Sequence, residues 1–175
     1  MSAARKPVIV RKLTRDWCAG YAAANLAAGS TELELLDTSG KLIKIDLSVV
    51  KWVCYVRELN VGEGSGGTDS QSPERLLRRR FSSRPRIAGL WLRLTLSDGD
   101  ELEGVAANDR SLVDGAGLLL TPPDTRSNTQ RVFVPRGTIR EFTILGVIAP
   151  GTPARQRSGA QPELFEKAIG EDQEG

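Results

Sequence analysis

One stretch of the 175-residue sequence decides the fold: Leu92-Arg93-Leu94-Thr95-Leu96-Ser97-Asp98-Gly99-Asp100-Glu101-Leu102-Glu103-Gly104-Val105. Apolar and polar residues alternate on both sides of an Asp-Gly pair, which is typical of two antiparallel strands joined by a tight hairpin. Gly99 can supply the positive φ of the turn, and Gly104 lets the returning strand bend sharply. The stretch therefore predicts the first hairpin of a small, strongly bent β-barrel.

The same strand pattern occurs a second time, earlier in the chain. Gly20 ends an apolar, extended segment as Gly104 does, 84 residues later (20 to 104). Further on, Val50 corresponds to Ile139 at a spacing of 89 residues (50 to 139), so the second copy carries about five extra residues in one loop. Self-similarity of this kind sets the architecture before any local assignment. It predicts two tandem copies of one small β unit.

The expected fold is mainly all-β, with two tandem five-stranded barrels and a short connecting helix. Residues 6–59 form the first barrel, and residues 60–72, rich in Gly and Ser, form a flexible linker. Residues 73–148 form a short basic helix and the second barrel, and residues 149–175 form a disordered tail. Residues 17–28 contain several alanines that favour a helix, but the repeat predicts a strand over 17–23, and we adopt the strand.

The second copy resembles the Sm-like (LSm) family of small β-barrels over about residues 90–147. The first motif of that family is the stretch quoted above, and the second is Val132-Phe133-Val134-Pro135-Arg136-Gly137-Thr138-Ile139. The first copy keeps a fainter form, in which Thr14-Arg15-Asp16 replaces the Asp-Gly turn. The resemblance implies the Sm-like form of an SH3-like barrel. A generic SH3-like barrel needs the same two glycines and stays an alternative.

The resemblance also implies a candidate site. In RNA-binding members, the segment after the bent strand supplies an Asp, a stacking residue and an Asn that reads a base. Asp109 and Leu112 stand in the first two places, whereas Asp114 stands at about the third, where a carboxylate repels phosphate. Arg136 and Gly137 are the expected nucleotide contacts. The alternative is that Arg136 is a turn arginine in solvent.

A second candidate site is the segment 75–86, which holds six arginines and no acidic residue. Ser72 as N-cap and Pro73 in the first turn predict that a short helix begins there. The segment could contact nucleic acid or an acidic protein surface, or it could be a solvated linker helix. The residues expected to bind are Arg75, Arg78, Arg79 and Arg80. The long polar loop 121–130 is a further, weaker candidate.

The chain contains no histidine and two cysteines, Cys18 and Cys54. The absence of histidine excludes Ser-His-Asp triads, Cys-His dyads and histidine-ligated metals. There is also no glycine motif that cradles phosphate, so we expect no enzymatic activity, no metal and no cofactor. The cysteines are expected to be small buried side chains, and a disulfide between them is the less favoured alternative.

Composition adds little to the functional hypothesis. The net charge of +2 is too small to indicate nucleic acid by itself. No long apolar run and no signal peptide are recognisable, so a cytoplasmic protein that does not insert into membranes is expected. Trp17, Trp52 and Trp91 are expected in packing contacts more than in base stacking.

Two functional hypotheses follow from these observations. The first is a non-enzymatic protein that binds single-stranded RNA through an Sm-like barrel and an arginine-rich helix. The second is a protein–protein interaction or assembly module of tandem SH3-like barrels with no nucleic-acid role. In the second, exposed strand edges would meet a partner chain or another copy of the protein, so a homo-oligomer is among the expected partners.

Overall fold

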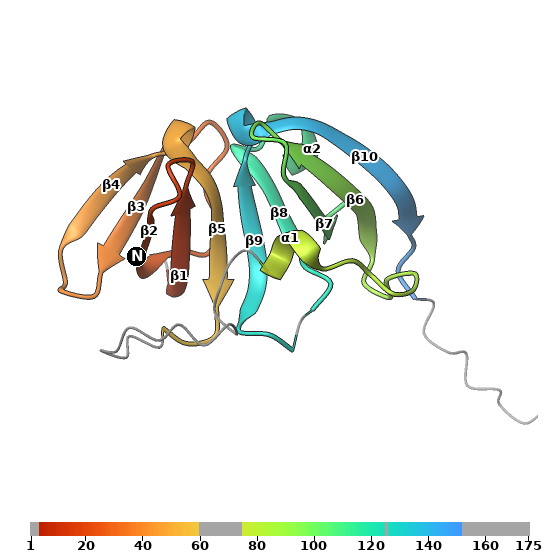
Figure 1. The fold of residues 1–175 in the computed structure, drawn as a ribbon, viewed down its shortest axis with the longest axis horizontal. Coiled ribbons are helices and arrows are strands. Elements are labelled where there is room, and N and C mark those ends of the chain that lie inside the picture. The colour runs from red at the N-terminus through yellow and green to blue at the C-terminus, as the bar shows by residue number, and fades with distance from the viewer. Residues whose placement is uncertain (1–3, 60–74, 125, 152–175) are drawn as a thin grey trace, which may run out of the picture.

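The structure, a computed structural model, describes residues 4–59, 75–124 and 126–151 (Figure 1). The first half of the chain, residues 4–59, contains β1 (Arg5–Lys12), β2 (Trp17–Ala23), β3 (Glu32–Asp37), β4 (Leu42–Asp46), the 3₁₀ turn η1 (Leu47–Val49) and β5 (Val50–Val56). The second half, residues 75–151, contains α1 (Arg75–Arg78), β6 (Gly89–Leu96), β7 (Glu101–Ala106), α2 (Ser111–Asp114), β8 (Gly117–Thr121), β9 (Thr129–Pro135), the 3₁₀ turn η2 (Arg136–Thr138) and β10 (Ile139–Ile148). The expectation of a mainly β protein is confirmed.

The hairpin predicted from residues 92–105 is formed by β6 and β7. Leu92 pairs with Gly104 and Thr95 pairs with Glu101 in antiparallel register. Alternate residues of β6 face the core, since Leu92, Leu94 and Leu96 are fully buried. Gly99 in the turn has a φ of 89°, the left-handed conformation that the Asp-Gly pair predicted.

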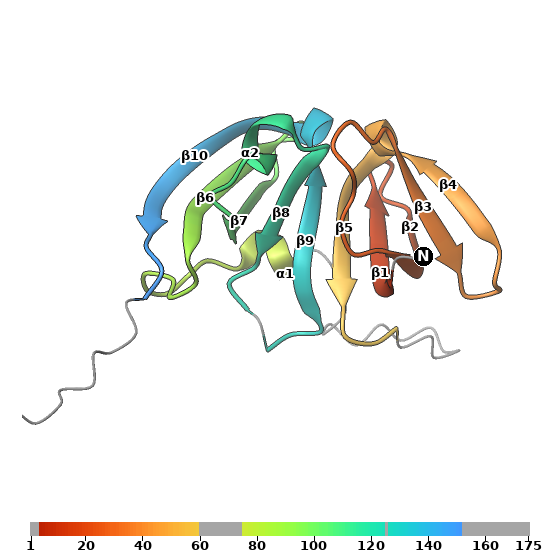
Figure 2. The same cartoon turned by 180° about the vertical axis from the view of Figure 1, so that it is seen from behind.

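All ten strands form one antiparallel sheet in the order β10-β6-β7-β8-β9-β5-β1-β2-β3-β4. Each half has the same internal order, which runs from its fifth strand through its first, second and third strands to its fourth. The halves are joined because β5 pairs with β9. Figures 1 and 2 show the ten strands fanned out, with β4 and β10 at the two outer ends of the sheet.

The expectation of two separate barrels therefore needs correction: the structure shows a single, unclosed sheet. The reason is that β5 has hydrogen-bonding partners on both sides, β1 in its own half and β9 in the other half. We call the pairing of β5 with β9 the joint. Its side chains also cross between the two halves. Trp52, Cys54 and Val56 of β5 pack in the hydrophobic cluster of the second half, and Phe133 of β9 packs in that of the first.

The repeat is present in the backbone as well as in the strand order. A Cβ atom built at Gly20 would lie 2.4 Å from the carbonyl oxygen of Leu36, and one at Gly104 would lie 2.9 Å from the Cβ of Leu120, 84 residues further on in each case. Each glycine thus permits a close approach of the second and third strands of its half. The turns η1 and η2 also correspond, since each connects the fourth strand of its half to the fifth.

Several local predictions are tested by the described residues. Residues 17–23 form strand β2, as the repeat predicted. Trp52 is buried, but Trp17 is 64% exposed, so the expected packing of Trp17 is wrong. Both cysteines are free; Cys54 is buried, whereas Cys18 is half-buried. The linker 60–72, the cap residues Ser72 and Pro73, and residues 152–175 of the tail lie outside the described residues.

Candidate nucleic-acid interface

Arg136, the first of the predicted nucleotide contacts, is bound to the backbone of α2. Its Nε donates to the carbonyl of Gly115 at 3.0 Å, and its Nη2 donates to the carbonyls of Ser111 at 3.2 Å and Leu112 at 3.0 Å. A cation at the end of a helix satisfies carbonyl groups that have no partner within the helix. Nε and Nη2 of Arg136 therefore hold the end of α2, which gives this exposed residue a structural role. At the neighbouring Gly137, a Cβ atom would meet nothing within 4 Å.

Asp109 and Leu112 lie on the same short segment and are also engaged locally. Asp109 Oδ1 accepts hydrogen bonds from Ser111 Oγ at 2.5 Å and from Ser111 N at 2.9 Å. The Ser111 side chain and backbone hold the pKa of Asp109 below its ordinary value, so it carries negative charge. Leu112 packs against the core of the second half. Asp114 forms an ion pair with Arg110 at 2.6 Å.

These residues form what we call the η2–α2 cluster: Asp109, Arg110, Leu112, Asp114, Arg136 and Gly137. The structure brings the predicted Arg136, Gly137, Asp109 and Leu112 together, because Arg136 binds carbonyls of α2. Its two arginines are balanced by two aspartates, so it offers a phosphate little net attraction. The cluster lies away from α1 in both views (Figures 1 and 2). The eight predicted site residues are therefore divided between two places.

The second place is α1 and the chain that follows it. Leu76 of α1 is buried in the core of the second half, and Leu77 packs against the same core. This apolar anchor leaves the arginines of the next residues at the surface. We call residues 78–86 the arginine segment; its exposed arginines are Arg78, Arg79, Arg80, Arg84 and Arg86. Arg75 is the first residue of α1.

Glu103 fastens the arginine segment to β7. This carboxylate is only 2% exposed, and it accepts hydrogen bonds from Phe81 N at 3.1 Å and Trp91 Nε1 at 2.9 Å. Arg80 Nε lies 3.5 Å and Arg93 Nη2 lies 3.6 Å from its other oxygen. A buried carboxylate needs this number of partners to offset the loss of water. Sequence reasoning missed Glu103, because alternation along β7 predicts only that it faces away from the core.

Other contacts fix individual arginines of the segment. Arg79 forms an ion pair with Asp124 at 3.5 Å, and Arg80 forms one with Glu101 at 3.1 Å. Arg84 Nη2 donates to the carbonyl of Val147 at 2.7 Å. The phenyl ring of Phe81 packs edge-on against Trp91, with ring centroids 6.1 Å apart. The segment is therefore a held surface feature with an ordered set of guanidinium groups.

The arginine segment surrounds a surface hollow of about 580 Å³. The hollow is lined mainly by cationic and hydroxyl side chains, namely Arg79, Arg80, Ser82, Ser83, Arg84 and Arg86, together with Phe81, Pro85, Pro123 and Asp124. Asp124 is the one acidic residue among these lining residues. Guanidinium and hydroxyl groups in this arrangement are suited to phosphate or carboxylate ligands.

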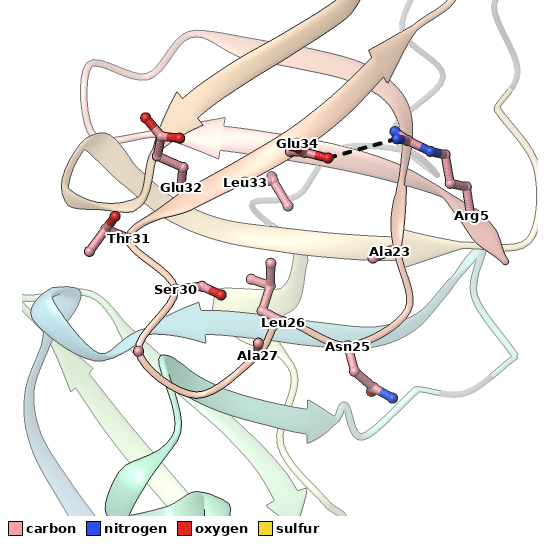
Figure 3. A pocket seen from close by; sticks show the side chains of 11 residues that line it. Arg5, Ala23, Asn25, Leu26, Ala27, Ser30, Thr31, Glu32, Leu33 and Glu34 are labelled. Carbon is pink, nitrogen blue, oxygen red and sulfur yellow. Dashed lines mark ion pairs between the residues drawn. The ribbon is translucent and has the colours of Figure 1, made fainter. Parts of the chain in front are cut away.

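A larger hollow, of about 640 Å³, lies between the β2–β3 loop and β3 in the first half. Figure 3 shows Glu32 and Glu34 on one side of it and Arg5 reaching toward Glu34, at a distance of 3.9 Å. Asn25 and Leu26 of the loop form part of its wall. Two carboxylates against one arginine make this hollow a poorer site for a phosphate than the arginine-lined one.

The long loop that follows β8 has a structural role in the described residues. Asn128 donates from Nδ2 to the carbonyl of Glu58 at 2.9 Å, and its Oδ1 accepts from the backbone N of Arg57 and of Glu58, each at 3.2 Å. The loop of the second half thus holds the end of β5 in the first half. This latch could not be predicted without knowing that β5 pairs with β9.

The described residues contain no group of three or more acidic, cysteine or histidine side chains placed to hold a metal ion. Among those residues, no helix combines the length and apolar character that crossing a membrane requires. A family model described as a family of unknown function (DUF6982) matches residues 4–146. Neither the curated proteins nor the solved structures contain a match.

Proposed function

The chain belongs to the DUF6982 family, whose function is unknown, and we propose from its geometry that it is a non-enzymatic protein that binds single-stranded RNA. The observation that carries the proposal is the gathering of Arg79, Arg80, Arg84 and Arg86 around one hollow. Phosphate neutralisation by arginine supplies most of the affinity of sequence-independent binding. Ser82 and Ser83 in the same hollow can donate hydrogen bonds to phosphate oxygens.

The held conformation of the segment supports the proposal. Leu76 is buried in the core and Glu103 binds the backbone of Phe81, so the arginines project from a fixed base. Groups that are already ordered lose less conformational entropy on binding. Glu101, Glu103 and Asp124 neutralise part of the positive charge, and we therefore expect moderate affinity with a strong dependence on salt.

The proposal moves the phosphate contacts from Arg136 to the arginine segment. Nε and Nη2 of Arg136 are engaged by three backbone carbonyls, and the carboxylates of Asp109 and Asp114 on the segment it holds would repel phosphate. We further propose that each half is an Sm-like unit and that the two units are fused through the β5–β9 pairing. The five-stranded order shared by the halves supports this comparison.

Fluorescence anisotropy with labelled U-rich and A-rich RNA, at low and physiological salt, tests the proposal. The variant Arg84→Ala/Arg86→Ala should weaken binding about tenfold. It should also reduce the slope of log K against log salt by about 0.7 for each phosphate that the variant no longer neutralises. Arg136→Ala and Arg110→Ala are matched controls in the η2–α2 cluster and should bind as the unaltered protein does.

Three results would contradict the proposal. Binding that ignores Arg84→Ala/Arg86→Ala at both salt concentrations would mean that the protein meets phosphate somewhere other than the arginine segment. No binding at either salt would remove RNA as the ligand and leave a protein-interaction role. Weakening by Arg136→Ala alone would return the nucleotide contacts to the η2–α2 cluster.

A further inference from the structure

The two ends of the sheet are counterparts of the two strands that form its central joint. In the joint, the fifth strand of the first half, β5, pairs with the fourth strand of the second half, β9. The strands left at the ends are the fifth strand of the second half, β10, and the fourth strand of the first half, β4. Within the described residues, each end therefore lacks the neighbour that its counterpart has inside the molecule. We infer that the protein assembles head to tail, with β10 of one copy pairing with β4 of the next in the manner of the β5–β9 joint.

Burial shows what β10 lacks. All seven residues of β5 are buried, whereas residues 140–144 of β10 are all exposed. Phe142 and Ile144 of β10 are each 53% exposed and Val147 is 57% exposed, while Leu42 on β4 is 48% exposed. Apolar side chains along an open strand edge favour the addition of another strand. The second copy is the partner because it carries the counterpart of the strand that already covers β5.

The repeat also predicts the register of this pairing. The turn η2 and strand β10 begin 89 residues after η1 and β5, at 136 and 139 against 47 and 50. Both fifth strands carry an irregularity at the same place, since the register shifts between Ile139 and Glu141 as it does opposite Arg11 and Lys12. The joint contains the cross-strand pairs Val53–Phe133, Cys54–Val132 and Tyr55–Arg131. Replacing each residue by its counterpart 89 positions away gives the pairs expected between copies: Phe142–Lys44, Thr143–Ile43 and Ile144–Leu42.

These pairs are chemically compatible. Ile144 and Leu42 are both about half exposed and would cover each other. Phe142 would lie beside Lys44, whose aliphatic stem can pack on the ring while its ammonium group stays near Glu32, 3.4 Å away. Thr143 and Ile43 are both β-branched and suit paired strands.

An ion pair of the joint also has a counterpart. Lys51 of β5 contacts Asp98 at 2.5 Å and also Asp100, both in the β6–β7 turn of the other half. The counterpart of Lys51 is Arg140, and the counterpart of Asp100, 84 residues earlier, is Asp16. Arg140 and Asp16 are both exposed within one copy. The assembly places Arg140 of one copy beside Asp16 of the next.

The contact between copies should be weaker than the joint inside the chain. The joint has a buried hydrogen bond from Thr138 Oγ1 to the carbonyl of Val50 at 2.8 Å, and the counterpart of Thr138 is Val49, which has no hydroxyl. The latch from Asn128 to Glu58 has no counterpart in the short β3–β4 turn. We therefore expect reversible assembly that grows with protein concentration. An interface of this head-to-tail kind closes into a ring or extends as a filament, depending on its rotation angle.

Light scattering after size exclusion and native mass spectrometry, on the full chain over a wide concentration range, test the inference. The unaltered protein should associate as concentration rises. Ile144→Lys blocks β10 and Leu42→Lys blocks β4, and each should weaken association about tenfold or more. Both positions are exposed, so each variant should keep its circular dichroism spectrum and melting temperature. Arg126→Asp, on the loop between β8 and β9, is the control and should associate normally.

Mixing the two blocked variants gives the sharpest result. Each variant alone has one usable edge and should be mainly monomeric at a concentration where the unaltered protein associates. At that concentration, the mixture should form a one-to-one heterodimer. A dimer of Leu42→Lys with itself would indicate β10–β10 pairing and would overturn the head-to-tail arrangement. An unaltered protein that stays monomeric at every concentration would overturn the inference entirely, and so would association that ignores both blocked edges.

A charge exchange tests the register. Arg140→Asp should weaken association, and the double variant Arg140→Asp/Asp16→Arg should restore it, because the two residues meet only between copies. A double variant that associates as poorly as Arg140→Asp alone would contradict the proposed register. None of these variants alters the arginine segment, so the RNA-binding proposal can fail or succeed separately.

Discussion

Strands β5 and β10 occupy the same place in the repeat and have opposite surroundings. Each follows a 3₁₀ turn and pairs with the first strand of its half. The sequence of β5 is apolar apart from Lys51 and is buried along its whole length, whereas β10 carries Arg140 and Glu141 and is exposed at residues 140–144. The difference is one neighbouring strand, since β9 covers β5 and no strand among the described residues covers the outer edge of β10.

This comparison shows that the joint between the halves has the burial and composition of a protein interior. Indole, thiol and valine side chains of β5 enter the core of the second half, and the ring of Phe133 enters the core of the first. Lys51, Thr138 and Asn128 then bind across the joint. The halves should therefore unfold together, because separating them would expose a hydrophobic core and several buried polar groups.

The largest expected effect compares Trp52 with its counterpart Glu141. Trp52→Ala should lower the free energy of unfolding by about 3–5 kcal/mol, because it leaves a cavity in the core shared by the two halves. Glu141→Ala, at the same place on the uncovered β10, should change it by less than about 0.5 kcal/mol. Urea unfolding measured below the concentration of self-association gives both values.

Trp52→Phe separates packing from hydrogen bonding in that experiment. The buried Trp52 Nε1 has no hydrogen-bond partner among the described residues, so replacing the indole by a phenyl ring should cost much less than truncation. Equal losses for Trp52→Ala and Glu141→Ala would show that the β5–β9 joint is not a shared core.

The second effect compares Lys51 with Arg140. Lys51 is 8% exposed and contacts two carboxylates that are only partly buried. Lys51→Met should therefore cost about 1–2 kcal/mol, less than the loss of a fully buried pair, since solvent screens Asp98 and Asp100. Arg140→Met, in a single copy, should cost nothing measurable. The pair is compared by urea unfolding at neutral pH.

The same contact predicts the pH dependence of stability. Burial alone would raise the pKa of Asp98, but the hydrogen bond from Lys51, the backbone N–H of Asp100 and the charge of Lys51 together outweigh it and leave the pKa below the ordinary 3.8. A carboxyl whose folded pKa is lowered stabilises the fold above its unfolded pKa and loses that contribution as pH falls through the folded value. The unaltered protein should lose stability below about pH 3.8 more steeply than Lys51→Met does. Parallel acid profiles would mean that Lys51 has no electrostatic role in the joint.

Much of the fold could be predicted from local pattern, and the arrangement of the halves could not. The Asp-Gly pair and the leucines of β6 determine a hairpin through turn conformation and alternation, which act over a few residues. The pairing of β5 with β9 joins residues about 80 apart, such as Val53 and Phe133, and leaves no periodic signal in either strand. One hint is present in the sequence: β5 is apolar on both faces, as a strand must be when alternate side chains enter two different cores.

The residue types of the candidate site could be predicted from the sequence, but the contacts that hold those residues mostly could not. A run of arginines without an acid indicates an anion-binding surface, and the structure arranges several of them around one hollow. Glu103 could not be identified as their anchor, because a glutamate on an alternating strand is expected to face solvent. The binding of Arg136 to carbonyls of α2 depends on where a four-residue helix ends, which sequence patterns locate poorly.

The smallest effect compares Arg15 with Gly99, which occupy the same turn position in the two halves. Both have positive φ, 73° for Arg15 and 89° for Gly99. An L-residue other than glycine loses roughly 1–2 kcal/mol in the left-handed region, whereas glycine gives up about 0.5–1 kcal/mol of conformational entropy on folding. Arg15→Gly should therefore stabilise the protein by about 0.5–1 kcal/mol, and Gly99→Ala should destabilise it by a similar amount. Gly137→Ala, where the new methyl group meets open space, is the control and should be neutral or slightly stabilising in the same urea titration. A destabilised Arg15→Gly would mean that the Arg15 side chain contributes more stability to the folded state than its backbone strain costs. The two turns would then share a backbone conformation but be stabilised by different interactions.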